Sequence, residues 1–110
     1  MFPAASVGQL ALVATLAGVG EELLFRGVLQ TILGWWMLPA ASIVIASLLF
    51  GLAHALSKVY FLLATAIGLF LGGLTWYFND LVAPIVAHAV YDFIALMYLT
   101  RSHVAAASKD

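Results

Sequence analysis

The chain has 110 residues, of which 65% are hydrophobic and only 8% are charged, and its formal net charge is −1. So few charges exclude a soluble globular domain, in which about 25% of residues are charged, and four Lys and Arg residues exclude a surface that neutralises a row of nucleic-acid phosphates. The absence of cysteine excludes disulfides, thiolate nucleophiles and cysteine-ligated metals.

Apolar stretches of the length of a membrane span follow one another along the chain. A span takes about 20 apolar residues, so the chain has room for about four transmembrane helices. Short polar or glycine-containing breaks separate the stretches, and the predicted helices cover about 7–33, 39–56, 59–78 and 82–100. We therefore predict an all-α, polytopic membrane bundle in which residues 1–103 form a single domain and 104–110 a tail.

The first predicted helix carries three charges, Glu21, Glu22 and Arg26, inside an apolar run. A charge at the centre of a bilayer costs roughly 2.5–3.5 kcal/mol, which indicates a functional site. Glu22 and Arg26 are spaced for an i,i+4 ion pair. Glu21 lies about 100° further round the helix, and we expect it to point into a polar cavity, where it can act as a general base. The alternative is a purely structural pair with Glu21 at a water-filled boundary.

Histidines lie on two of the later helices. His54 follows Phe50 by one turn on the second helix, and alone it fits a core histidine bonded to a backbone carbonyl. On the fourth helix His88 and Asp92 share one face, so the carboxylate can orient the imidazole or join it as a ligand. If the bundle brings Glu21 together with these three polar residues, the cluster can hold and activate a water.

Two chemistries fit this predicted cluster, and its residues favour neither. In one, a zinc ion is bound by His and carboxylate ligands drawn from Glu21, His54, His88 and Asp92, with one position left open. In the other, which needs no metal, Glu21 acts as the base on a water that the histidines hold. The cofactor therefore stays open.

The third helix carries glycines in place of polar groups. The Gly68–Gly72 spacing permits close approach of a neighbouring helix.

The positive charges indicate how the bundle lies in the cell membrane, since four antiparallel spans place Lys58, Arg101 and Lys109 on the side of the N-terminus. Lys and Arg accumulate in cytoplasmic segments, so we expect a multi-pass protein with both termini in the cytoplasm.

The expected depths of the polar residues conflict. Counted from that side at 1.5 Å per residue, Glu21 and His88 lie roughly 20–25 Å deep and His54 only roughly 6 Å. Helices that simply span the bilayer would keep them apart. Either the second helix ends inside the bundle, or the first is displaced or broken near Gly18–Gly20, where irregular backbone would have to line a cavity.

Three short motifs on successive apolar helices resemble those of the CPBP intramembrane proteases, also called the Abi family, and they read Glu21-Glu22-x-x-x-Arg26, Phe50-x-x-x-His54 and His88-x-x-x-Asp92. That family includes CAAX prenyl endopeptidases and bacteriocin-processing or immunity-related membrane proteins. The resemblance implies an intramembrane endopeptidase that acts on a membrane-associated peptide or protein. The family is usually longer, so we expect the chain to be a catalytic core, either a minimal member or a fragment.

The resemblance also implies roles for single residues. Glu21 would activate the water, His54 and His88 would help to hold the water or a metal, and the remaining motif residues, Glu22, Arg26 and Phe50, would support them. The position of Asp92 is often Asn in the family, in an oxyanion-stabilising role, and an ionised Asp would repel an oxyanion. A protonated Asp92, a metal ligand, or an orienter of His88 would each remove this conflict.

Two other classes of function are compatible with the same residues. One is a non-catalytic membrane protein that binds a partner, as in bacteriocin self-immunity. The other is a proton or ion conductor, a usual role for ionisable groups within a membrane. Four spans without an inverted repeat make the conductor the weaker alternative. The substrate and the oligomeric state are not predicted.

Overall fold

The computed structural model describes the backbone of residues 5–108 and the side chains of residues 5–102. The described residues contain no strand, and the helices are α1 (Val7–Glu22), η1 (Leu23–Leu29), α2 (Gln30–Gly34), α3 (Pro39–Ala53), α4 (Lys58–Phe78) and α5 (Val82–Ser108). Three helical runs are long and apolar enough to cross a membrane, and α3 is a shorter apolar helix. The predicted all-α membrane bundle is confirmed.

The first three elements form one uninterrupted run of 28 residues, Val7–Gly34. Ser6 begins it with a capping box, since its Oγ accepts a hydrogen bond from the Gln9 backbone N–H at 3.1 Å and its own N–H donates to Gln9 Oε1 at 2.9 Å. The second element of the run, η1, is a π-helix, a wider helical winding that is frequent at functional sites. Nothing in its composition predicted this change of winding.

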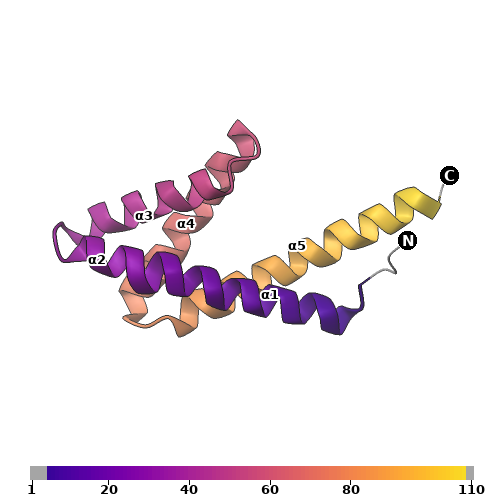
Figure 1. Ribbon diagram of the computed structural model, residues 1–110, viewed down its shortest axis with the longest axis horizontal. Helices are drawn as coiled ribbons and strands as arrows, with labels where there is room; N and C mark the ends of the chain where they lie inside the picture. The colour runs from indigo at the N-terminus through magenta and orange to yellow at the C-terminus, as the bar shows by residue number, and fades with distance from the viewer. Residues whose placement is uncertain (1–4, 109–110) are drawn as a thin grey trace.

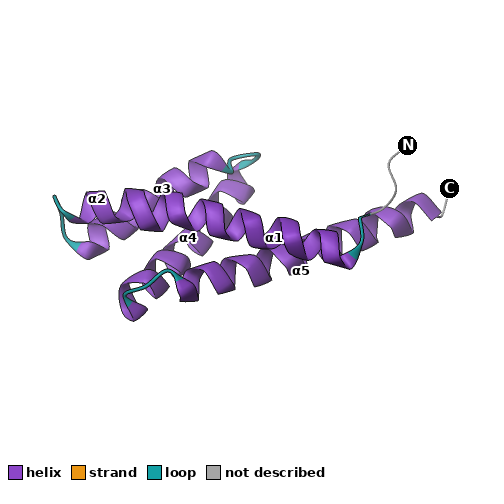
Figure 2. Ribbon diagram, turned by 60° about the horizontal axis from the view of Figure 1, so that its bottom comes forward, coloured by secondary structure: helices purple, strands orange, loops and turns teal. Residues whose placement is uncertain are grey.

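Two pairs of helices make up the molecule, which measures 55 × 29 × 20 Å along its principal axes. α1 and α5 lie side by side, so that the start of α1 and the end of α5 are at the same end (Figures 1 and 2). They meet closely at Gly18, where an added Cβ would lie only 3.1 Å from the backbone N of Ala89. The α3–α4 hairpin forms the second pair, and its helix α4 crosses the long run (Figure 1).

Glycines on α4 allow this second close approach. A Cβ on Gly68 would lie 3.2 Å from Cα of Ser47 on α3 and 3.0 Å from Nη2 of Arg26. One turn later, a Cβ on Gly72 would lie 2.8 Å from Oε1 of Gln30. The predicted use of the Gly68–Gly72 spacing is therefore confirmed, and it serves both α3 and the long run.

Gly68→Ala is accordingly expected to destabilise the bundle by about 1–3 kcal/mol, the usual cost of overpacking a tight site. The added methyl group meets the backbone of Ser47 and a guanidinium held in place by hydrogen bonds, and neither can easily give way. The matched control is Gly73→Ala, because a Cβ there meets no described atom within 4 Å. Thermal unfolding in detergent measures both, and equal midpoints would contradict the expectation.

Two helix ends differ from the prediction by more than one residue. α3 ends at Ala53 instead of Leu56, because His54 leaves the helical backbone with φ −115° and ψ 20°, and Ser57 then caps α4. The turn His54-Ala55-Leu56-Ser57 includes neither Gly nor Pro, so no helix breaker marked the end of α3 in the sequence. α5 continues through Ser108, which makes most of the predicted tail at 104–110 helical; its alanines favour helix. Residues 109–110 lie outside the described part.

Candidate active site

The polar residues predicted from three different helices lie around one cavity of about 240 Å³. Glu21 comes from α1, His54 directly follows the last residue of α3, and His88 and Asp92 come from α5. The rest of the wall is mainly apolar and aromatic, formed by Phe50, Tyr60, Leu63, Ala64, Ile67 and Tyr91. The site is thus a polar cluster on one side of an apolar cavity.

The early end of α3 resolves the conflict of depths. Glu21 lies near the middle of the 28-residue run. α3 has 15 residues, or about 22 Å at 1.5 Å per residue, and it places His54 beside Glu21 instead of near the end of a full span. The structure agrees with the first of the two predicted solutions, and the predicted break in the first helix is wrong because α1 is helical through Gly18–Gly20.

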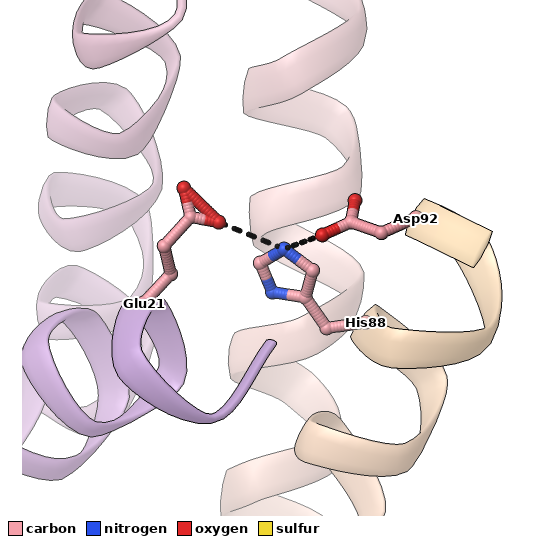
Figure 3. Close-up of side chains that lie close together, drawn as sticks. All are labelled: Glu21, His88 and Asp92. Carbon is pink, nitrogen blue, oxygen red and sulfur yellow. Dashed lines mark ion pairs between the residues drawn. The ribbon is translucent and has the colours of Figure 1, made fainter. Parts of the chain in front are cut away.

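Glu21 bridges the two histidines. Its Oε1 lies 3.1 Å from Nε2 of His54, and its Oε2 lies 3.0 Å from Nε2 of His88. Figure 3 shows Glu21 and Asp92 approaching the same ring nitrogen of His88 from opposite sides, and the Asp92 Oδ2 distance is 3.2 Å. The Glu21 side chain remains 33% exposed, so it is accessible to a water in the cavity.

Both imidazole rings are oriented by a contact at Nδ1. In His54 this atom is 2.7 Å from the carbonyl oxygen of Phe50, and in His88 it is 2.8 Å from Oε2 of Glu22. A carbonyl oxygen and an ion-paired carboxylate only accept hydrogen bonds, so Nδ1 carries the hydrogen in each ring. An ionised carboxylate likewise only accepts, so the contacts of both Nε2 atoms with Glu21 are hydrogen bonds when Nε2 also carries a hydrogen, that is, when the ring is protonated. Without that hydrogen, Nε2 offers its lone pair to a water or a metal.

Glu22 and Arg26 form the predicted ion pair, which is confirmed at 2.9 Å between Arg26 Nη1 and Glu22 Oε2. Both side chains are buried, with 0% and 1% exposed. Arg26 Nη2 also donates to the Gly68 carbonyl at 2.9 Å, and its Cζ stacks 4.7 Å from the Phe50 ring centroid. This group ties the site to α3 and α4.

The contact between Glu22 and His88 was missed from the sequence. The i,i+4 spacing predicted the arginine partner alone, and no local pattern links residues that are 66 positions apart. Phe50 holds the other side of the site, with its ring centroid 4.3 Å from that of His54 and 5.9 Å from that of His88. The supporting residues therefore position both histidines.

The cluster holds three carboxylates and one arginine, so two further positive charges would balance it, either two protons or one divalent cation. Among the described residues, Glu21, His88 and Asp92 offer ligand atoms that all lie within 4.8 Å of one another, a donor set that suits zinc. His54, predicted as a fourth ligand, lies outside this group and contacts the other oxygen of Glu21. A metal held there would act as a Lewis acid.

Comparisons with known proteins place the chain in a family. The family model of type II CAAX prenyl endopeptidases, Rce1-like, matches residues 3–94, a range that includes the whole cluster. The uncharacterized protein YpbD of Bacillus subtilis (strain 168) is 34% identical over 105 residues, covering 94% of this chain and 52% of that relative. The chain thus spans about half the length of this curated relative. No solved structure matches.

Proposed function

This chain belongs to the Rce1-like family of type II CAAX prenyl endopeptidases, and we propose that it hydrolyses a peptide bond of a membrane-associated peptide or protein at the Glu21 cluster. The observation that carries the proposal is the position of Glu21, which contacts both histidines and lines a cavity large enough for part of a peptide. The family of the chain implies a CAAX-type peptidase and a membrane setting.

Glu21 acts as the general base in this proposal. Its carboxylate takes a proton from a water in the cavity, and the oxygen of that water attacks the carbonyl carbon of the substrate. His54 and His88, whose Nε2 atoms face the same carboxylate, hold the water and donate to the oxyanion when they are protonated. Glu21 then returns its proton to the amine nitrogen as the C–N bond breaks, which restores the ionised base.

Hydrolysis in proteoliposomes tests the proposal. The purified protein is combined with quenched fluorescent peptides that end in a CAAX sequence, with and without a prenyl group on the cysteine. Cleavage of either peptide with a rate that depends on Glu21 supports the proposal, and faster cleavage of the prenylated form assigns the substrate class. Loss of cleavage with zinc chelators and its return with added zinc would favour the metal alternative.

Two substitutions of Asp92 test whether this residue acts as a metal ligand. Asp92→Asn is expected to keep activity within about one order of magnitude, because the amide can still accept a hydrogen bond from a protonated His88 and adds an N–H for the oxyanion. Asp92→Ala should lower the cleavage rate about 10²-fold, because alanine offers neither an acceptor for His88 nor an N–H for the oxyanion. Initial rates of peptide cleavage measure both. An Asp92→Asn variant as inactive as the alanine variant would show that the carboxylate itself is needed, as a metal ligand would be.

A further inference from the structure

A second cavity, of about 180 Å³, lies on the other side of Arg26 from the active site. It is lined by residues of α2, α3 and α4, among them Gln30, Ser42 and Thr75, and it reaches Asn79, the residue that follows α4. Arg26 lines this cavity and Phe50 lines the active-site cavity. The stacked pair of these two side chains therefore stands between the two spaces.

Two of the residues that line this second cavity each have a fully buried polar atom without a partner among the described residues. These atoms are Nε of Arg26 and Oε1 of Gln30, on side chains that are only 1% and 8% exposed. The other two guanidinium nitrogens are already paired with Glu22 and Gly68. The Gln30 amide N–H donates to the Gly72 carbonyl at 3.3 Å, which leaves Oε1 as a free acceptor. Buried groups of this kind are rarely left unpaired.

The hydroxyl groups of the cavity add further acceptors. Ser42 donates to the Pro39 carbonyl at 2.8 Å, and Thr75 donates to the Leu71 carbonyl at 3.0 Å. Thr31, also in the wall, donates to the Arg26 carbonyl at 3.2 Å. Since a carbonyl only accepts, each hydroxyl hydrogen is already bonded, and the oxygens offer only lone pairs.

This set of groups selects the occupant. Anions are disfavoured because the hydroxyl and amide oxygens present lone pairs, and metal cations are disfavoured by the positive guanidinium. Water can accept from Arg26 Nε and donate to the oxygens, and a polar cavity of this size holds several waters. We propose that the cavity is filled with water that enters from the end of the bundle where Asn79 lies and hydrates the buried Arg26.

Hydration would bring water to the back of the catalytic cluster by a route separate from the active-site cavity. That cavity has a mainly apolar and aromatic wall, so a bound membrane substrate would exclude water from it. Hydration of the second cavity is independent of the proposed peptidase function, and its test needs no substrate.

Cysteine labelling gives the test, because the chain has no cysteine of its own. Ser42→Cys is compared with Ala46→Cys, one turn later on α3, where the side chain is equally buried but does not line the cavity. Membrane fragments open on both sides are treated with a small, charged methanethiosulfonate reagent. Because only the thiolate reacts, and thiolates form in water, Ser42→Cys should react at least about tenfold faster. Equal rates would overturn the proposal.

A second measurement covers the case in which the cysteine variants fold poorly. Gln30→Met keeps the length of the side chain but removes both polar atoms. If the cavity holds water, this change loses the bonds to Gly72 and to the waters, and the midpoint of thermal unfolding should fall. If the cavity is dry, removal of the unpaired Oε1 should leave the midpoint unchanged or raise it, and either result would contradict a hydrated cavity.

Discussion

Replacing Glu21 by glutamine is expected to lower peptide hydrolysis by about 10²–10⁴-fold, the contribution that a general base usually makes. Glutamine has the shape of glutamate and can still form hydrogen bonds to His54 and His88, so the site should keep its geometry. It cannot take a proton from water. The loss should therefore appear in the rate of the chemical step while the melting temperature stays close to that of the wild type.

The measurement is the initial rate of cleavage in proteoliposomes, alongside thermal unfolding of the same preparations. Asp80→Asn is the matched control, because this carboxylate lies outside the cluster and accepts hydrogen bonds from backbone N–H groups of Val82 and Ala83, which asparagine can also do. It should leave the rate unchanged. A Glu21→Gln variant that cleaves at the wild-type rate would remove Glu21 from the catalytic role.

The same variant separates the other functions. A non-catalytic protein that protects by binding a partner would keep that effect in Glu21→Gln. A conductor would instead show proton flux across liposomes that the substitution abolishes. The peptidase proposal expects that the Glu21→Gln protein is intact and correctly inserted in the membrane but no longer hydrolyses the peptide.

Helix periodicity was sufficient for the parts of the site that lie within one helix. The i,i+4 spacing correctly paired Glu22 with Arg26 and placed His88 next to Asp92, and the order of the polar residues on separate apolar helices indicated a shared site. Apolar length likewise located the helices, because a membrane leaves few alternatives for the backbone.

The remaining features depend on contacts between distant residues or on backbone geometry that composition does not encode. The end of α3 at Ala53 is such a case, since the residues directly after it include neither Gly nor Pro. The π-helical winding of η1 is another. So is the bond from Glu22 to His88, which needs α1 and α5 to lie side by side. The end of α3 and the bond from Glu22 position His54 and His88 at Glu21.

Arg26→Met is expected to cost about 3–5 kcal/mol of unfolding free energy, the usual loss when one partner of a buried ion pair is removed. Methionine fills much of the space but leaves the fully buried Glu22 carboxylate without its cation. The Gly68 carbonyl and the Phe50 ring lose their contacts as well. Since Glu22 also holds His88, the hydrolysis rate should fall together with stability.

A second substitution shows whether the uncompensated charge is the cause. Glu22→Gln combined with Arg26→Met removes both charges, while the amide oxygen of glutamine can still accept from Nδ1 of His88. The double variant should therefore be more stable than Arg26→Met alone. Residues in contact usually show a coupling energy of about 0.5–3 kcal/mol, and we expect a value in this range. Unfolding in mixed detergent micelles measures all four members of the cycle. If the two losses simply add, the pair is not coupled, and Arg26 stabilises the bundle through Gly68 and Phe50 instead.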